Sequence, residues 1–177
     1  MSAVIHSRMS TELGEITYVV NRDGLIGTFL EGQAGAPAAE RLGVEVPLVA
    51  NPVAHAAHSQ MIQYLAVTRA SFDLPLATYG DPFQETVWAM LREIPYGDTV
   101  TYGRLAERIG DRAAAQRVGR AVARNPLLIV IPCHRVIGAT GELVGFSAGL
   151  ERKERLLTIE GRRFSNGRIF PKVRVAL

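Results

Sequence analysis

The sequence predicts an α/β protein of two domains, residues 1–80 and 81–177. A strand-turn-strand pattern lies near the N-terminus, and helical spacing of apolar residues dominates beyond Gly80. The charge also changes sign there, with 4 basic and 7 acidic residues before residue 81 and 16 basic and 10 acidic residues after residue 80. A cationic half suits a polyanionic partner such as nucleic acid, although a solvated charged surface has the same composition.

The chain of 177 residues, 47% of them hydrophobic, contains enough apolar material for a core. No stretch approaches the roughly 20 apolar residues of a membrane helix. The N-terminus lacks the apolar region of a signal peptide. We therefore expect a cytoplasmic protein without membrane contact, and one unpaired cysteine fits such a reducing location.

In the N-terminal part, residues 12–31 predict a β-hairpin around the turn that starts at Asn21. Residues 32–52 are typical of a loop with room for one short element, 52–69 predict a helix, and 72–79 are compatible with another strand. His55 and His58 lie three residues apart, but no cysteine or nearby carboxylate accompanies them. We expect no metal site there.

The C-terminal part opens with a predicted helix, in which Asp81 is the N-cap, proline follows, and Gln84 completes a capping box. Trp88 lies beside its apolar stripe and is expected in the core. Helices over 102–109 and 112–124 then form a predicted helix-turn-helix. The second of them carries an outer basic stripe of Arg117, Arg120 and Arg124.

The only cysteine, Cys133, follows the apolar run 127–131 and a proline. Such a run is typical of a buried strand or core segment. Cys133 is then either a small buried residue or a reactive thiol. A normal thiol is mostly protonated at neutral pH, and the adjacent His134 and Arg135 supply the base and the cation that would activate it.

Residues 132–137, Pro-Cys-His-Arg-Val-Ile, resemble the active-site motif of the O6-alkylguanine-DNA alkyltransferases, also called methylated-DNA-protein-cysteine methyltransferases. The resemblance covers residues 81–161. It includes Ile-Pro-Tyr-Gly at 94–97, Tyr-Gly at 102–103, Asn-Pro at 125–126 and Glu-Gly at 160–161, in matching order and spacing.

This resemblance implies a ribonuclease-H-like sheet with a helix for residues 1–80, which is expected to act as scaffold with little chemistry. It implies a mainly helical, DNA-binding alkyltransferase domain for residues 81–177. The expected activity is direct repair of DNA: an O6-alkylguanine, and also O4-methylthymine, is flipped out of the duplex, and its alkyl group passes irreversibly to Cys133. A thioether has no carbonyl for water to attack, so each chain acts once. The expected partner is alkylated double-stranded DNA, which a monomer binds through the minor groove; whether binding is cooperative stays open. No cofactor and no metal are expected.

The resemblance also assigns roles to residues. His134 activates Cys133 through a water molecule, and Glu160 fixes the imidazole. Tyr102 donates a proton or hydrogen bond to a ring nitrogen of the leaving guanine. Asn125 ties the cysteine turn to the preceding helix, and by its position it is also a helix C-cap tolerant of left-handed geometry. The expected pocket wall consists of Val136, Phe146 and Ser147. The expected DNA contacts are Ala114, Ala115, Gln116, Arg117, Gly119, Arg120, Arg124 and Arg135, although a supporting role in the loop is favoured for Arg135.

Two residues depart from the family pattern. Phe146 stands where the family often has a tyrosine. A phenylalanine can still stack on the base, but it lacks the tyrosine hydroxyl. Gln116 stands where the family often has an arginine that fills the gap left by the flipped base, and Arg117 points about 100° away on a helix.

Three other functions compete with alkyl transfer. An alkyltransferase-like damage sensor would lack the reactive cysteine. A helix-turn-helix regulator would bind DNA without alkyl transfer. A cysteine hydrolase would turn over many times.

Overall fold

The computed structural model describes residues 3–170 of the chain. The strands are β1 Ile5–Thr11, β2 Gly14–Asn21, β3 Gly24–Leu30, β4 Val44–Glu45, β5 Val100–Thr101, β6 Val136–Ile137, β7 Phe164–Ser165 and β8 Arg168–Ile169. The α-helices are α1 Pro52–Leu65, α2 Pro82–Arg92, α3 Tyr102–Ile109, α4 Ala115–Ala123 and α5 Leu150–Ile159. Short 3-10 helices cover Ala39–Arg41, Leu48–Ala50, Arg112–Ala114 and Cys133–Arg135.

The N-terminal half is a sheet of order β3-β2-β1-β4, antiparallel except for the parallel pair β1 and β4. The predicted hairpin is confirmed as β2 and β3. β1 was not predicted, because its sequence Ile-His-Ser-Arg-Met-Ser-Thr is mostly polar, and it buries His6 and Ser7. The region predicted as a loop contains β4 and two 3-10 helices.

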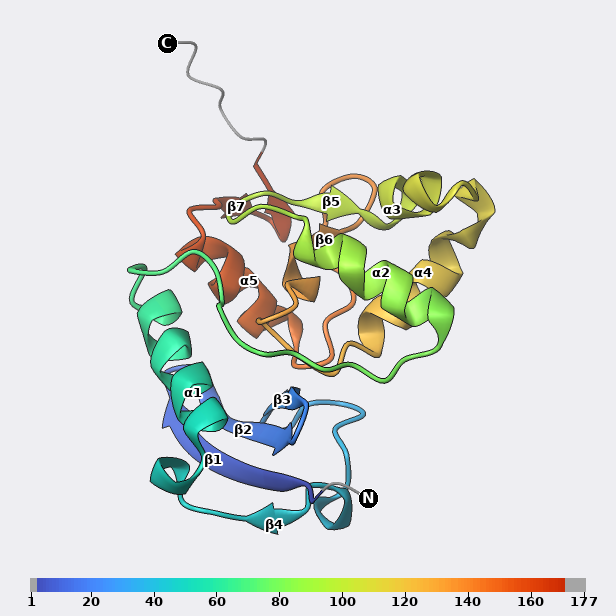
Figure 1. Ribbon diagram of the computed structural model, residues 1–177. Helices are drawn as coiled ribbons and strands as arrows, with labels where there is room; N and C mark the ends of the chain where they lie inside the picture. Colours follow the sequence, from blue (N-terminus) through green and yellow to red (C-terminus); the bar gives the residue numbers. More distant parts are fainter. Residues whose placement is uncertain (1–2, 171–177) are drawn as a thin grey trace.

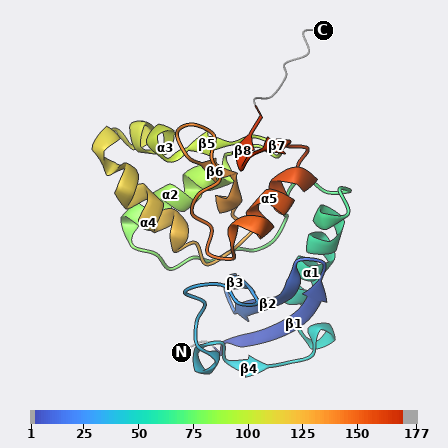
Figure 2. The same ribbon diagram turned by 180° about the vertical axis from the view of Figure 1, so that it is seen from behind.

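Helix α1 packs along the sheet, and its C-terminal end reaches toward the C-terminal half of the chain (Figures 1 and 2). Asn51 caps its start by accepting a hydrogen bond from the Ala54 N–H, and Pro52 occupies the first turn. Ala57, Met61 and Tyr64 are buried at spacings of four and three residues. The helix ends at Leu65, four residues before the predicted limit, and Val67 has a positive φ of 59°.

Residues 72–79, whose sequence is compatible with a strand, do not form one, since this segment makes only a single bridge, from Leu76 to Leu25. Pro75 has no N–H to donate and offers only its carbonyl, to the Leu25 N–H. The close crossing explains Gly24 at the β2–β3 turn. A Cβ there would lie 2.3 Å from the Pro75 oxygen.

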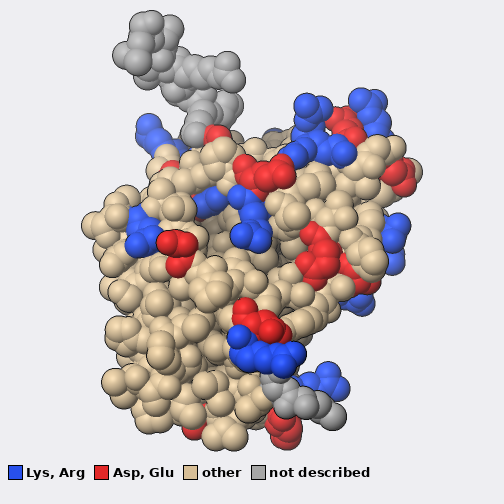
Figure 3. Space-filling model, in the orientation of Figure 1, with Lys and Arg blue, Asp and Glu red and all other residues tan. Residues whose placement is uncertain are grey.

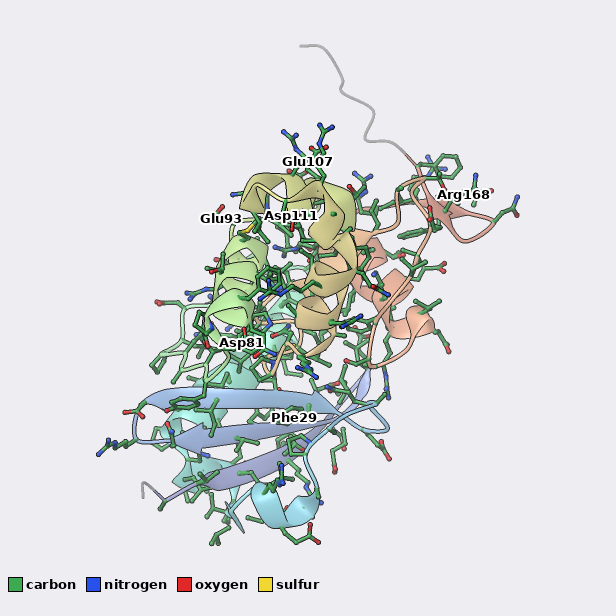
Figure 4. All side chains as sticks on the ribbon, turned by 90° about the vertical axis from the view of Figure 1, so that its right-hand side faces the viewer. Phe29, Asp81, Glu93, Glu107, Asp111 and Arg168 are labelled. Atoms are coloured by element: carbon green, nitrogen blue, oxygen red, sulfur yellow. The ribbon has the colours of Figure 1, made fainter. Side chains whose placement is uncertain are left out.

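In the C-terminal half, α2 begins at the predicted capping box of Asp81 and Gln84. Figure 4 shows Asp81 at the end of α2 that faces the sheet and Glu93 at the far end. Trp88 is buried as predicted, and its indole N–H donates to the Ala121 oxygen of α4 at 2.9 Å. Helix α3 has the predicted bounds, whereas the helix predicted over 112–124 starts with a 3-10 turn before α4.

The larger apolar core cluster contains residues of both halves, and the run 127–131 lies inside it. The run is a core segment and not a strand, because the chain turns there: the Ile131 N–H donates to the Leu127 oxygen, and Ile129 has φ of 72°. Thr28 of β3 fixes this turn. Its N–H donates to the Pro126 oxygen, its hydroxyl donates to the Leu128 oxygen, and its carbonyl accepts from the Leu128 N–H.

Candidate active site

Cys133 is the first residue of the 3-10 turn Cys133–Arg135, directly after the core segment, and only 3% of it is exposed. Asn125 holds the loop that leads to it. The Asn125 amide donates to the Ile131 oxygen at 2.8 Å, and its side-chain oxygen accepts from the Leu127 N–H at 3.0 Å. The tie from Asn125 to the cysteine turn is therefore present. The C-cap, however, is Arg124 with φ of −93°, and Asn125 is not among the residues with positive φ.

Burial determines the resting state of the thiol. Removal from water raises the pKa of Cys133 to about 11, although a hydrogen bond from Asn125 and the charge of Lys153 act in the opposite direction. At neutral pH the thiolate fraction is then on the order of one part in ten thousand, so nucleophilic attack requires a base.

His134, the next residue in the chain, is an imidazole with a defined orientation. The ring is fully buried, and its Nε2 lies 2.8 Å from Oε1 of Glu160. An ionised carboxylate can only accept, so Nε2 carries the proton and Nδ1 has the free lone pair. Within residues 3–170, Nδ1 has no hydrogen-bond partner. Burial lowers the pKa of His134 more than Glu160 raises it, so the resting imidazole is neutral.

Glu160 sits at the C-terminal end of α5 and is buried, not an exposed end-of-helix carboxylate. It accepts hydrogen bonds from His134, from Arg135, from the Gly97 N–H at 2.9 Å and from the Tyr64 hydroxyl at 2.6 Å. Burial by itself would raise its pKa, but the bonds from His134 and Arg135 outweigh this effect and lower the pKa to about 2.

The prediction that Arg135 contacts DNA does not fit the structure. Its guanidinium is buried and donates to both oxygens of Glu160 at 3.0 Å and to the Ile94 oxygen at 2.6 Å. These bonds hold the guanidinium in the interior of the protein. Arg135 supports the loop, the role favoured from the sequence.

Lys153, a fully buried lysine of α5, was not predicted as part of the site. Its ammonium donates to the Val136 and Val144 oxygens, both at 2.5 Å, and so links β6 to the loop before α5. Burial lowers the pKa of Lys153 to about 8. The sequence does carry one indication that Lys153 is buried: it lies three and four residues before Leu156 and Leu157, on the apolar face of a helix.

The residues predicted to line the pocket surround this link. Val136 is buried in β6, and Phe146 and Ser147 are half-buried in the loop before α5. The Tyr102 hydroxyl, at the start of α3, lies 3.3 Å from the Gly145 oxygen. Burial, and then the neighbouring Cys133, raise the pKa of Tyr102 to about 12, so the phenol is protonated and able to donate.

Apart from Arg135, the predicted DNA contacts lie at the end of the 3-10 turn Arg112–Ala114, on α4 and at its C-cap. Figure 3 shows both basic and acidic side chains at the upper right, where α3 and α4 lie. Gln116, Arg117, Arg120 and Arg124 are exposed, and Ala115 and Gly119 are partly exposed. Arg117 stacks on the Phe83 ring of α2, with its guanidinium carbon 3.8 Å from the ring centre. Ala114 is an exception to the predicted contacts, because its side chain is buried and its N–H donates to the Asp111 oxygen.

The N-terminal half, which is expected to act as scaffold with little chemistry, makes two hydrogen bonds to the predicted site. Tyr64 of α1 reaches Glu160, and the Ala34 N–H donates to the Ser147 oxygen at 2.9 Å. Sequence reasoning had no signal for either contact. A tyrosine on the apolar face of a helix is ordinarily a core residue.

Within residues 3–170, no group of three or more His, Cys, Asp or Glu side chains is placed to hold a metal ion. The ring of His58 instead lies 3.3 Å from the Tyr18 hydroxyl. None of the helices in the same range is long and apolar enough to cross a membrane.

Comparison with known proteins agrees with this geometry. The family model described as "6-O-methylguanine DNA methyltransferase, DNA binding domain" matches residues 82–162. The methylated-DNA–protein-cysteine methyltransferase of Methanosarcina acetivorans is 51% identical over 105 residues, which are 59% of this chain and 67% of the relative. Its namesake from Mycolicibacterium paratuberculosis is 50% identical over 113 residues, 63% of this chain and 68% of the relative.

Solved structures extend the similarity to the N-terminal half. The O6-methylguanine methyltransferase of Mycobacterium tuberculosis superposes with a TM-score of 0.79 at 35% identity, over 89% of this chain and 92% of that chain. The structure of M. tuberculosis OGT in complex with DNA gives a TM-score of 0.81 at 34% identity, over 89% and 93%. Fold and sequence thus place the chain among DNA-binding proteins that accept a methyl group on a cysteine. The chain belongs to the methylated-DNA–protein-cysteine methyltransferase family.

Proposed function

We propose that this protein repairs alkylated DNA by transferring the alkyl group from O6 of guanine to Cys133, once per chain. The observation that supports this most directly is the arrangement of Cys133, His134 and Glu160. A carboxylate holds the histidine by Nε2 and leaves Nδ1 to receive the proton of the buried thiol.

In this reaction the thiol proton passes through a water molecule to Nδ1 of His134. The sulfur then attacks the alkyl carbon, and a carbon–sulfur bond forms as the bond from that carbon to O6 breaks. The electron pair stays on the guanine, and Tyr102 donates a proton or a hydrogen bond to a ring nitrogen. The guanine anion takes up one proton, which balances the proton that the thiol gave to His134. The products are then an S-alkylcysteine and an unmodified guanine.

The positions of Val136, Phe146 and Ser147 support their role as the walls of the base pocket. The Lys153 ammonium holds this wall, because it joins the Val136 carbonyl to the Val144 carbonyl. Phe146 offers a stacking surface, and O4-methylthymine, which also carries a methylated exocyclic oxygen, is a second substrate of the same pocket.

For the architecture, the proposal is a ribonuclease-H-like scaffold domain over residues 1–80 and a DNA-binding alkyltransferase domain over 81–177. Helices α3 and α4 form a helix-turn-helix, and α4 enters the minor groove with Gln116 at the gap left by the flipped base. Arg120 and Arg124 contact phosphates, which fixes the position on DNA without reading sequence. The protein acts in the cytoplasm as a monomer.

Intact mass measured after incubation with an O6-methylguanine duplex tests the chemistry. The mass should rise by one methyl group per chain, located on Cys133, and Cys133→Ala should abolish transfer while retaining DNA affinity. Several turnovers per chain, or a methyl group on another residue, would contradict the suicide mechanism.

A further inference from the structure

Tyr64 brings a hydroxyl group from the N-terminal half of the chain into the active site. It lies in the last turn of α1 and is fully buried. Its ring contacts Phe72 at 5.4 Å and Tyr96 edge-on at 5.9 Å between ring centres. Aromatic packing on two sides therefore fixes the direction of the hydroxyl.

The hydroxyl touches both partners of the histidine–carboxylate pair. It donates to Oε1 of Glu160 at 2.6 Å and lies 3.3 Å from Nε2 of His134. The single phenolic proton goes to the carboxylate, because Nε2 also carries a proton for the same oxygen. Burial and then the charge of Glu160 raise the pKa of Tyr64 far above its usual value, so the group remains a donor at any working pH.

We propose that Tyr64 is a positioning residue for alkyl transfer, which sets the orientation and the basicity of His134 through Glu160. This inference rests on the proposed function. The hydroxyl shares Oε1 with His134 and so holds the carboxylate where it accepts the Nε2 proton, which leaves the lone pair of Nδ1 free. It also withdraws negative charge from Glu160, which limits the stabilisation of a protonated imidazole.

The other charged and titratable groups around His134 come from different elements and remain when the hydroxyl is removed. Arg135 and Cys133 belong to the same 3-10 turn, Lys153 and Glu160 to α5 and its end, and Tyr96 to the loop after α2. The Tyr96 hydroxyl donates to the Ile159 oxygen and not to the carboxylate. A change at Tyr64 therefore isolates one donor of Glu160.

Tyr64→Phe keeps the ring and removes only this donor. Single-turnover alkyl transfer from an O6-methylguanine duplex is measured against pH for the wild type and for this variant. Without the hydroxyl, Glu160 stabilises protonated His134 better, so the pKa of His134 rises. The acid limb of the rate profile should move to higher pH by on the order of one unit.

Tyr18→Phe is the matched control. Tyr18 is equally buried, and its hydroxyl also contacts α1, at His58, but it does not reach Glu160. This variant should reproduce the wild-type profile. An unshifted acid limb in Tyr64→Phe, or an equal shift in Tyr18→Phe, would overturn the inference, whereas a wild type that accepts no methyl group would instead refute the proposed function.

A second measurement needs no variant. Nitrogen-15 NMR of the wild-type protein should show His134 protonated at Nε2 and bare at Nδ1, with no titration near the usual histidine pKa of about 6.5. A proton on Nδ1, or ordinary titration, would contradict the positioning role even if Tyr64→Phe failed to fold.

Discussion

Replacing Glu160 by glutamine should destabilise the protein in a way that depends on pH. The folded state lowers the pKa of this carboxyl from 4.5 to about 2. One pKa unit corresponds to about 1.4 kcal/mol, so the ionised carboxylate contributes about 3 kcal/mol to the free energy of unfolding. Because Glu160 is only 5% exposed, solvent screens little of this contribution.

The direction of the pH dependence of stability follows from the depressed pKa of Glu160. Above pH 4.5 the carboxyl is ionised in both the folded and the unfolded state, and its contribution to the free energy of unfolding is complete. Between pH 4.5 and about 2 the unfolded chain takes up the proton first, so this contribution is lost. Glu160→Gln also leaves the Arg135 cation buried without its partner, a loss that typically costs about 3–5 kcal/mol. The two figures describe the same interaction and do not add.

Urea unfolding between pH 7 and pH 3, followed by the fluorescence of the single tryptophan, Trp88, measures this effect. The gap between wild type and Glu160→Gln should be about 3 kcal/mol at pH 7 and should narrow below pH 4.5. Glu12→Gln is the control, because the Arg155–Glu12 pair has side chains 51% and 45% exposed and should contribute at most about 1 kcal/mol. Parallel stability curves for Glu160→Gln and wild type across this range would refute the reasoning.

Two further predictions concern the DNA face. Neutralising Arg120 and Arg124 together should weaken binding to damaged and undamaged duplex alike and reduce the slope of log affinity against log salt by about 2. Repair of a free O6-alkylated base should change little. Unchanged duplex binding at every salt concentration would show that these arginines are only solvated. Gln116→Arg should speed transfer most from duplex DNA, less from single strands and least from a free alkylated base, because an inserted arginine offsets part of the cost of base flipping. Equal acceleration on all three substrates would exclude a role for position 116 in flipping.

Local signals in the sequence were sufficient for the elements that carry their own start and stop residues. The capping box at Asp81, the glycine after Ile109 and the hairpin turn before Gly24 are each satisfied within a few residues. The cysteine motif is likewise contiguous. These features were predicted because their physical causes are close together in the chain.

The missing and the wrong predictions concern features that depend on contacts between distant residues. β1 is mostly polar and is a strand because β2 and β4 pair with it on both sides. Arg135 resembles any basic residue beside a DNA-binding motif, and only the carboxylate of Glu160, 25 residues later, shows that its charge is used internally. Periodicity assigns a residue to a face, but it does not identify the polar partner that meets it there.

Tyr64 is the extreme case, because 96 residues separate it from the carboxylate that it contacts. Its neighbours in the sequence are those of a core tyrosine, and its ring does pack in the core. Only the hydroxyl group reaches the His134–Glu160 pair. The same core cluster that contains Tyr18 of the sheet also contains Cys133. Docking of the two halves therefore sets the hydrogen bonds around His134, and substitutions in the interface that move α1 should change the pH dependence of transfer without altering any residue of the cysteine motif.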